Sequence, residues 1–242
     1  MTTHATVKTV KKLHNIIIDL LFPPACVGCD NFGPWLCDDC LKNIGAPIET
    51  CIFCNEKTLH GLTCGDCRKH NSLTGIISIG GYKNPVLRNS IHALKFSGVR
   101  DIAEPLGDLL AKSILKTLGS DLNGFSIIPM PLHKKRERER GFNQSALLAD
   151  RISSLLSIPV ANLLIREKAT TPQASLNSKM LDLRQENIAD AFIINPEYTA
   201  IMPKKIIILD DVATSGSTLN EATKLLGEKG VKEIWGAVVC RG

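Results

Sequence analysis

Eight of the nine cysteines form four Cys-x-x-Cys units, a spacing that is typical of metal-binding knuckles. Two such units supply four thiolates, the tetrahedral ligand set that a structural zinc ion prefers. The separations within each half of the run are similar, which predicts two tandem zinc ribbons with one ion each. Pairing the first unit with the third and the second with the fourth is an open alternative, as is one ion instead of two. The expected ligands are Cys26, Cys29, Cys37, Cys40, Cys51, Cys54, Cys64 and Cys67.

A disulfide framework is the other interpretation of these cysteines. We favour zinc because the rest of the chain has the character of a cytosolic protein, in which disulfides persist poorly. The cysteine-rich stretch also has few large hydrophobic side chains, so metal binding would be what orders it. The ninth cysteine, Cys240, lies in the apolar run 238–240 and is expected to be a buried structural thiol.

The segment from Ile206 to Leu219 carries a second pattern with chemical meaning. Four apolar residues precede Asp210 and Asp211, and a short loop rich in Thr, Ser and Gly then leads into an expected helix. Main-chain N–H groups at the start of a helix favour an anion, and the hydroxyl side chains add donors. A phosphate group fits this loop, whereas the two carboxylates are better suited to accept hydrogen bonds from sugar hydroxyls. The pattern predicts a ribose 5-phosphate site.

A purely structural interpretation of this segment is that Asp211 caps the helix and that the Ser and Thr residues belong to a turn. Two common nucleotide-binding loops are excluded. No Gly-Lys-Ser/Thr follows at the spacing of a Walker loop, and the G-x-G-x-x-G string of dinucleotide-binding proteins is absent.

Strands and helices alternate through the rest of the chain, which indicates βαβ units. The apolar strands predict a parallel sheet covered on both faces, and ligands bind such a sheet outside the carboxyl ends of its strands. The loops that begin at Pro129, Arg166 and Asp210 are therefore expected to converge. The expected strands are 75–82, 125–129, 160–165, 205–209 and 233–239, the expected helices are 89–96, 101–118, 143–156 and 217–228, and 166–190 is a polar stretch.

Composition restricts the class of protein. The chain has 242 residues, of which 44% are hydrophobic and 22% charged, and its net charge of +5 permits an anionic ligand. No apolar run approaches the roughly 18 residues of a membrane span, and no signal-peptide cleavage site is found, so we expect a cytoplasmic protein. The expected organisation is an amphipathic segment over 1–22, a double zinc ribbon over 23–70 and an α/β domain over 71–242.

The segment from Ile206 to Leu219 resembles the phosphoribosyl diphosphate motif of type I phosphoribosyltransferases. Other strings narrow the resemblance to the ComF family of competence-associated proteins, over roughly Leu20 to Arg241. The resemblance implies the α/β parallel-sheet fold of a type I phosphoribosyltransferase with a small N-terminal zinc-ribbon domain. The strings are Arg140-Gly141-Phe142-Asn143-Gln144, which is the most specific, Pro129-Met130-Pro131-Leu132-His133, Thr171-x-Gln173-x-x-Leu176, Arg184-x-x-Asn187 and Lys95-Phe96.

The resemblance also implies roles for residues of the loop segment. Asp210 and Asp211 would hold the ribose hydroxyls, and the loop 213–218 would bind the 5-phosphate. Ala213 and Ser215 depart from the bulkier residue and the Thr that are frequent in the family, but both changes leave the main-chain cradle intact. The implied catalytic residues are Asp210, Asp211 and Arg140.

The diphosphate would be bound by the turn from Met130 to Lys134. The stretch 166–190 stands where the family has a mobile lid, so Arg166, Lys168 and Arg184 would close over the diphosphate. Mg²⁺ would be held largely by the ligand's own oxygens. The implied set of residues that bind phosphoribosyl diphosphate is Met130, Pro131, Leu132, Arg184, Asp210, Asp211, Val212, Ala213, Thr214, Ser215, Gly216, Ser217 and Thr218.

The run from His133 to Arg140 contains five basic and two acidic residues. A solvated surface whose charges pair with one another is one interpretation. The other is that its cations lie near the diphosphate or along a nucleic-acid backbone, and the 7 Phe, 2 Trp and 2 Tyr of the chain then argue for modest affinity without sequence readout. The candidate nucleic-acid contacts are Lys134, Lys135, Arg136, Arg138 and Arg140.

Two classes of function fit these expectations. The first is a protein of natural competence that binds phosphoribosyl diphosphate or ribose 5-phosphate and contacts single-stranded DNA; the resemblance implies a helicase and a recombination mediator as its partners. The second is an active phosphoribosyltransferase that transfers the phosphoribosyl group to an unidentified nucleophile in nucleotide or nutrient metabolism. The sequence has no acceptor motif and no glutaminase domain, so it does not identify that nucleophile.

Overall fold

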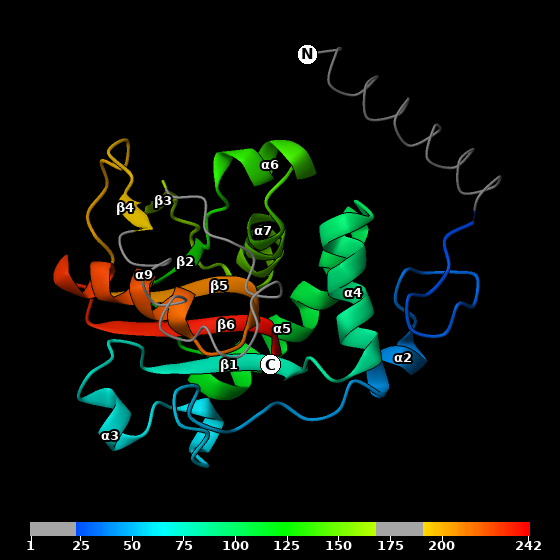
Figure 1. The fold of residues 1–242 in the computed structure, drawn as a ribbon, viewed down its shortest axis with the longest axis horizontal. Coiled ribbons are helices and arrows are strands. Elements are labelled where there is room, and N and C mark those ends of the chain that lie inside the picture. The colour runs from blue at the N-terminus through cyan, green and yellow to red at the C-terminus, as the bar shows by residue number, and fades with distance from the viewer. Residues whose placement is uncertain (1–22, 168–190) are drawn as a thin grey trace, which may run out of the picture.

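Residues 23–167 and 191–242 are described by the structure, a computed structural model, and they are arranged around a four-stranded sheet (Figure 1). Each pair of neighbouring strands is parallel. Ile207, for example, lies opposite Trp235 on one side and Ile127 on the other. The predicted parallel α/β sheet is therefore confirmed. The strand order is β1 (Gly75–Gly81), β6 (Glu233–Arg241), β5 (Lys205–Ala213) and β2 (Phe125–Pro129).

Helices cover both faces of this sheet because successive side chains of a strand point to opposite sides. Ile207 and Leu209 of β5 belong to the core on one face, together with residues of α4 (Pro85–Phe96), α5 (Ala103–Leu118) and α7 (Gln144–Leu156). Ile206 and Ile208 belong to the core on the other face, with α9 (Ser217–Glu228). The carboxyl ends of β2 and β5 consequently open at the same edge of the sheet.

The remaining elements are short. β3 (Leu164–Arg166) and β4 (Phe192–Ile194) form an antiparallel pair on the α9 side of the core. The helix α6 (Lys134–Arg140) follows β2, and the 3-10 turn η2 (Arg100–Ile102) precedes α5. The cysteine-rich part contains α2 (Asp38–Lys42), the turn η1 (Leu59–Gly61) and α3 (Gly65–Arg68).

Two predicted helix starts differ from the structure by one or two residues, and a third, at residue 89, differs by a full turn. The helix predicted over 89–96 begins at Pro85, because the Oδ1 atom of Asn84 accepts a hydrogen bond from the N–H of Leu87 at 3.2 Å. Proline suits the first turn of a helix, where its missing N–H would have no partner. The cap and the proline together start α4 a full turn earlier than its apolar pattern indicates.

Predicted strand boundaries also differ: the strand predicted over 75–82 ends at Gly81, and the one predicted over 233–239 continues to Arg241. The strand predicted over 160–165 is wrong, since Val160 makes a single bridge to Ile127 and the chain then enters β3, outside the main sheet. The strand predicted to end at residue 209 continues to Ala213. Asp210 and Asp211 therefore lie within β5 and not in the loop behind it.

The two halves of the cysteine-rich part contact different elements (Figure 1). The half around α2 lies against α4, where the Nδ2 atom of Asn89 donates to the carbonyl of Val27 at 3.0 Å. The half around α3 lies along β1, where Leu62 forms a bridge to Gly75. Each half is thus held by a different part of the α/β fold.

Within residues 23–167 and 191–242, no helix has both the length and the apolar character to span a membrane. The predicted amphipathic segment 1–22 lies outside the described residues. The same holds for Lys168 and Arg184, which the sequence places in a lid over the ligand.

Candidate functional site

One carboxylate of the acidic pair in β5, that of Asp211, forms an ion pair with a lysine. The Nζ atom of Lys95, in the last turn of α4, lies 2.8 Å from Oδ1 of Asp211. The side chain of Asp211 is 5% exposed and that of Lys95 19%, so this ion pair is largely withdrawn from water. A buried carboxylate needs such a partner, because desolvation of an unpaired charge costs several kcal/mol.

A glutamine at the start of α7 links this carboxylate to an arginine. The Nε2 atom of Gln144 donates to Oδ2 of Asp211 at 2.9 Å, and its Oε1 atom accepts from Nη1 of Arg140 at 2.9 Å. The guanidinium of Arg140 lies 5.5 Å from the centre of the Phe96 ring. Lys95 and Phe96 are neighbours in α4, so the contacts form a closed ring.

Asp210 has a different environment. Its Oδ1 atom accepts from the N–H of Asp211 at 2.8 Å and from the hydroxyl of Ser145 at 3.4 Å. Burial and the adjacent charge of Asp211 raise the pKa of Asp210 to about 7, although Lys95, the Asp211 N–H and Arg166 act in the opposite direction. Arg166, at the end of β3, is thus close enough to lower the pKa of Asp210.

The Thr/Ser/Gly loop follows this acidic pair. Gly216 is the N-cap of α9 and has a φ of 73°, a left-handed conformation that glycine adopts without strain. A small hollow opens in front of α9, where the first N–H groups of the helix have no acceptor within the helix. The residues that line it are Asp210, Val212, Ala213, Thr214, Gly216, Ser217, Thr218 and Leu219.

Ser215 also belongs to this loop, and its hydroxyl lies 2.7 Å from that of Ser217. Most of the loop residues named from the sequence thus surround one space that contains hydroxyl groups, helix N–H groups and the Asp210 carboxylate. A phosphate bound to a polyhydroxylated sugar matches that combination of donors and acceptors.

The turn after β2, predicted to bind the diphosphate, is less exposed to a ligand than the loop before α9. Met130 is 3% exposed, its N–H donates to the carbonyl of Leu209 at 2.8 Å, and its own carbonyl accepts from Nδ2 of Asn143 at 3.0 Å. Pro131 and Leu132 are half-buried beside it. Met130 therefore fixes the distance between β2, β5 and α7.

The basic run, for which the sequence leaves open a solvated surface or contact with a diphosphate or nucleic acid, forms the helix α6. Its N-cap is His133, whose Nδ1 atom accepts from the N–H of Lys135 at 3.2 Å. Lys134, Lys135 and Arg138 are exposed, whereas Arg136 and Arg140 are half-buried. Of these residues, Arg140 reaches the acidic strand through Gln144 and so joins the ring described above.

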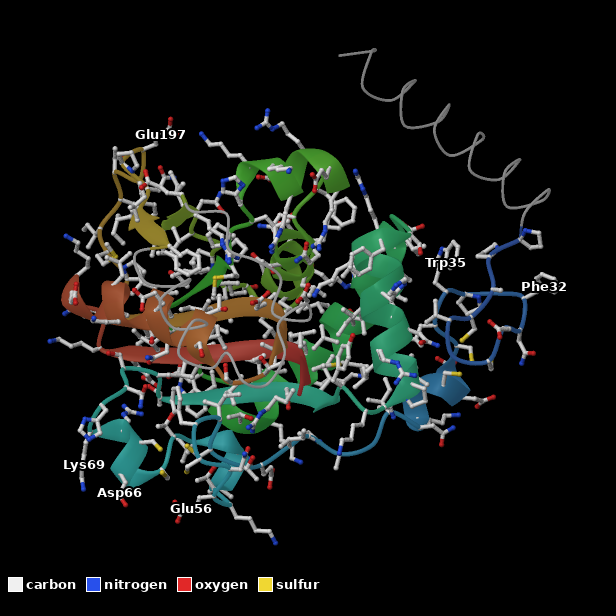
Figure 2. All side chains as sticks on the ribbon, viewed as in Figure 1. Phe32, Trp35, Glu56, Asp66, Lys69 and Glu197 are labelled. Carbon is white, nitrogen blue, oxygen red and sulfur yellow. The ribbon has the colours of Figure 1, made fainter. Side chains whose placement is uncertain are left out.

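The cysteines form two tetrads, each drawn from two consecutive units, so the tandem pairing is the one that the structure brings together. Within each tetrad all sulfur atoms lie within 4.8 Å of one another, and Figure 2 shows them gathered beside α2 and beside α3. The Sγ atoms of Cys29 and Cys37 are 3.8 Å apart, and those of Cys54 and Cys64 are 3.5 Å apart. Tetrahedral zinc with bonds of about 2.3 Å needs sulfur separations of about 3.8 Å, so the residues fit the metal.

The first cysteine of each tetrad has a lowered pKa, which favours its thiolate form. Burial opposes its ionisation, but main-chain N–H groups outweigh that effect. The pKa of Cys26 is lowered to about 6, with donors from Cys37, Gly28 and Cys29. The pKa of Cys51 is lowered to about 7 in the same way. The remaining cysteine, Cys240, is 0% exposed, which confirms the predicted buried thiol.

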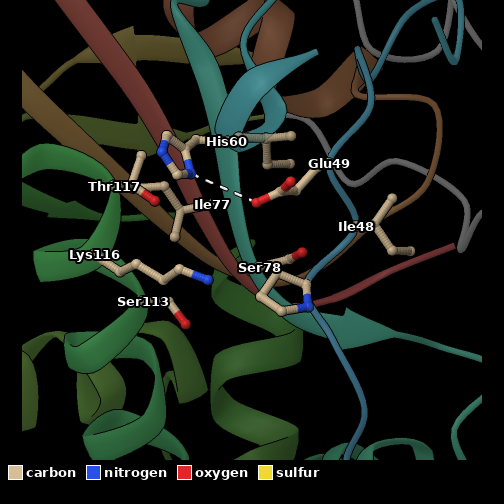
Figure 3. Close-up of a pocket in the computed structure, with 10 residues that line it drawn as sticks. Ile48, Glu49, His60, Ile77, Ser78, Ser113, Lys116 and Thr117 are labelled. Carbon is tan, nitrogen blue, oxygen red and sulfur yellow. Dashed lines mark ion pairs between the residues drawn. The ribbon is translucent and has the colours of Figure 1, made fainter. Parts of the chain in front are cut away.

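A second cavity lies between β1, α5 and the segment before Cys51 (Figure 3). Ile77 and Ser78 of β1 contribute to its wall, and the Nδ1 atom of His60 lies 3.5 Å from a carboxylate oxygen of Glu49 at its rim. None of the residues that the sequence singles out as a ligand contact or metal ligand lines it. The candidate site is therefore the hollow at the carboxyl edge.

Sequence reasoning missed the roles of Lys95 and Gln144. Both occur in strings that resemble the ComF family, but nothing in the spacing indicated that they contact Asp211, which is 116 and 67 positions away in the chain. Phe96 was likewise noted without a role, and it is 67% exposed beside Arg140. These contacts become visible only when α4 and α7 are placed on the sheet.

Comparison with known proteins adds an independent finding. Residues 143–242 match the family model of the phosphoribosyl transferase domain. The chain is 34% identical to Competence protein F of Haemophilus influenzae over 208 residues, which cover 83% of this chain and 89% of that protein. It is 32% identical to DNA utilization protein YhgH of Escherichia coli K12 over 216 residues (86% and 92%) and 29% identical to Competence protein ComFC of Bacillus subtilis over 202 residues (80% and 77%).

The raised pKa of Asp210 predicts a pH dependence of stability. Between about pH 4 and pH 7 the folded chain binds a proton at Asp210 that the unfolded chain has released, so the free energy of unfolding falls as the pH rises through that range. The variant Asp210→Asn cannot ionise at this position, so its Tm should fall less than that of the wild-type protein between pH 5 and pH 8. Each kcal/mol of difference in unfolding free energy corresponds to about 2–4 °C in Tm.

Thermal unfolding of the ligand-free protein at pH 5 and pH 8 measures this difference. The exposed Asp150 on α7 provides the control variant, Asp150→Asn, which should follow the wild-type protein. An equal fall in Tm for wild type and Asp210→Asn would show that Asp210 does not carry the effect.

Proposed function

Since the chain belongs to the ComF family of competence proteins and contains a phosphoribosyl transferase domain, we propose that it binds phosphoribosyl diphosphate or ribose 5-phosphate as part of DNA uptake. The observation that carries this proposal is the hollow at the start of α9, where hydroxyl side chains and helix N–H groups lie next to Asp210. An anion and a set of sugar hydroxyls are thereby accommodated side by side.

The binding mode follows from the charges. The 5-phosphate takes the N–H and hydroxyl donors of Ser217 and Thr218, and the ribose hydroxyls donate to Asp210 and Asp211. Lys95 already compensates Asp211, which leaves Asp210 as the carboxylate with the greater need for a donor. A diphosphate would extend toward α6, where Arg136 and Arg140 lie, and Mg²⁺ held by its oxygens would reduce its charge.

Transfer of the phosphoribosyl group to a nucleophile is the enzymatic form of the same proposal. Such an enzyme would act by positioning the ribose and stabilising the departing diphosphate with cations and amides. Release of diphosphate in a screen of bases and amines would support it, and its absence while the ligand still binds would leave binding as the function.

We also infer that each cysteine tetrad holds one structural zinc ion. The sulfur separations, the tandem pairing and the main-chain donors to Cys26 and Cys51 support this. Zinc would order two short segments that have little hydrophobic core of their own.

The proposal predicts that Thr218→Val weakens binding of phosphoribosyl diphosphate. Loss of a hydrogen bond to a charged group costs about 1.5–3 kcal/mol, which is roughly tenfold or more in Kd. Isothermal titration calorimetry in the presence of Mg²⁺ measures this effect. Thr117→Val is the matched control, because Thr117 lines the separate cavity between β1 and α5.

Wild-type affinity in Thr218→Val would remove the hydroxyl of Thr218 from the site. A wild-type protein that binds neither phosphoribosyl diphosphate nor ribose 5-phosphate would contradict the proposed function as a whole.

Contact with single-stranded DNA is a second candidate function, and one observation favours it. Phe96 is 67% exposed, its ring lies 4.8 Å from that of His92, and the Arg140 guanidinium is 5.5 Å away. An exposed aromatic ring beside cations suits an unpaired base and its phosphate. The exposed cations of α6 continue this surface, which supports a strand that follows α6 toward the candidate site.

If this surface binds DNA, Phe96→Ala should weaken binding of a single-stranded oligonucleotide about fivefold or more, because stacking contributes about 1–3 kcal/mol per base. Arg138→Ala should lower the slope of log affinity against log salt by about 0.7. Fluorescence anisotropy over a salt series measures both quantities.

Phe32→Ala is the matched control, since Phe32 is 79% exposed on the first cysteine half, away from α6 (Figure 2). Equal affinities for Phe96→Ala and Phe32→Ala, with an unchanged salt slope in Arg138→Ala, would exclude this surface as the DNA contact.

A further inference from the structure

The second cysteine tetrad touches the loop that forms the candidate phosphate site. A Cβ atom placed on Gly216 would lie 2.9 Å from Cγ1 of Ile52 and 3.5 Å from Cε1 of Phe53. Ile52 and Phe53 are the two residues between Cys51 and Cys54, so the metal-binding knuckle itself forms the wall behind the loop. Ile52 is 4% exposed and belongs to the same core cluster as Ala213 and Leu219.

An arginine at the end of β6 holds the chain segment that precedes Ile52. The Nη1 atom of Arg241 donates to the carbonyl of Thr50 at 2.6 Å and to that of Ile48 at 3.3 Å, in the chain segment that leads into Cys51. The N–H of Gly242 donates to the carbonyl of Ala213 at 2.9 Å. The last residues of the chain therefore connect the approach to the tetrad with the beginning of the loop.

The shape of this wall depends on the four sulfur atoms. The main-chain N–H groups of Cys64, Phe53 and Cys54 donate to the sulfur of Cys51, which curls the knuckle toward the other sulfur atoms. Cys64 and Cys67 come from a different segment and close the tetrad. Zinc bonds to all four sulfur atoms would join the two segments more strongly than the hydrogen bonds that link Cys64 to the sulfur atoms of Cys51 and Cys54, so loss of the metal would loosen Ile52 against Gly216.

The first tetrad provides a natural comparison, because it contacts a different element. A Cβ on Gly28 would lie 3.2 Å from Cγ2 of Val86 in α4, and Ile44 of this half is 5% exposed in the core on that side. These contacts are made to α4 and not to the loop 213–218. The two tetrads are thus chemically alike and differ in what they support.

We propose that Ile52 and Phe53 are positioning residues for the phosphate loop, so that zinc at the second tetrad and a phosphorylated ligand at residues 213–218 stabilise each other's binding. The inference rests on the proposed function, since it concerns the same loop. Coupling between two sites is reciprocal, so zinc should strengthen ligand binding and the ligand should slow loss of zinc from this tetrad. The first tetrad should show neither effect.

The variant Ile52→Ala tests this coupling against Ile44→Ala, its match in residue type and burial. Isothermal titration calorimetry with phosphoribosyl diphosphate and Mg²⁺ should show affinity weakened about three- to thirtyfold in Ile52→Ala, the usual range for residues that act through a neighbour, and little changed in Ile44→Ala. Phe53→Leu, a milder change at a half-buried position, serves if Ile52→Ala does not fold, and it should weaken binding in the same direction.

A second measurement uses the wild-type chain and needs no variant. Zinc release to a chromogenic chelator should occur in two phases, one for each tetrad, and phosphoribosyl diphosphate should slow one phase only. The retained zinc is assigned to the second tetrad by repeating the assay with Cys29→Ser/Cys37→Ser, which removes the first.

Wild-type affinity in both Ile52→Ala and Phe53→Leu, or zinc release that the ligand leaves unchanged, would overturn the coupling while the proposed function stands. Failure of the wild-type protein to bind phosphoribosyl diphosphate would overturn the proposed function and the coupling with it.

Discussion

Two adjacent carboxylates near the end of a buried strand are the constraint around which the structure is arranged. Asp210 and Asp211 would repel each other in this place, and each needs a partner that the strand itself does not supply. For Asp211 the partners are Lys95 from α4 and Gln144 from α7. The helices α4 and α7 therefore compensate the charge of Asp211 as well as packing in the core. Asp210, the other carboxylate, lines the hollow at the start of α9.

The two cysteine tetrads lie against different parts of the α/β fold. The first lies against α4, the helix that carries Lys95, and the second lies against the loop behind Asp211. The phosphoribosyl transferase domain matched over residues 143–242 does not include α4 or either tetrad. In this chain the candidate site is therefore completed by segments that precede the matched domain.

Much of the architecture is predictable from sequence, for reasons that are local. The unbroken apolar run before Asp210 indicates a strand buried on both sides, and the Cys-x-x-Cys spacing limits which sulfur atoms can meet. The continuation of β5 through two aspartates is not predictable in this way. Charged residues are disfavoured in a buried strand unless partners from elsewhere in the chain compensate their charge. Those partners, Lys95 and Gln144, are set by the packing of helices on the sheet. The contact of Ile52 with Gly216 is missed for the same reason, since it joins residues far apart in the chain.

A crystal structure of the protein with ribose 5-phosphate tests the central claim most directly. The account predicts the phosphate within hydrogen-bonding distance of the N–H groups of Ser217 and Thr218, and the ribose hydroxyls directed at Asp210. A phosphate located elsewhere, or a loop whose N–H groups turn away from a ligand that is bound at another position, would contradict it.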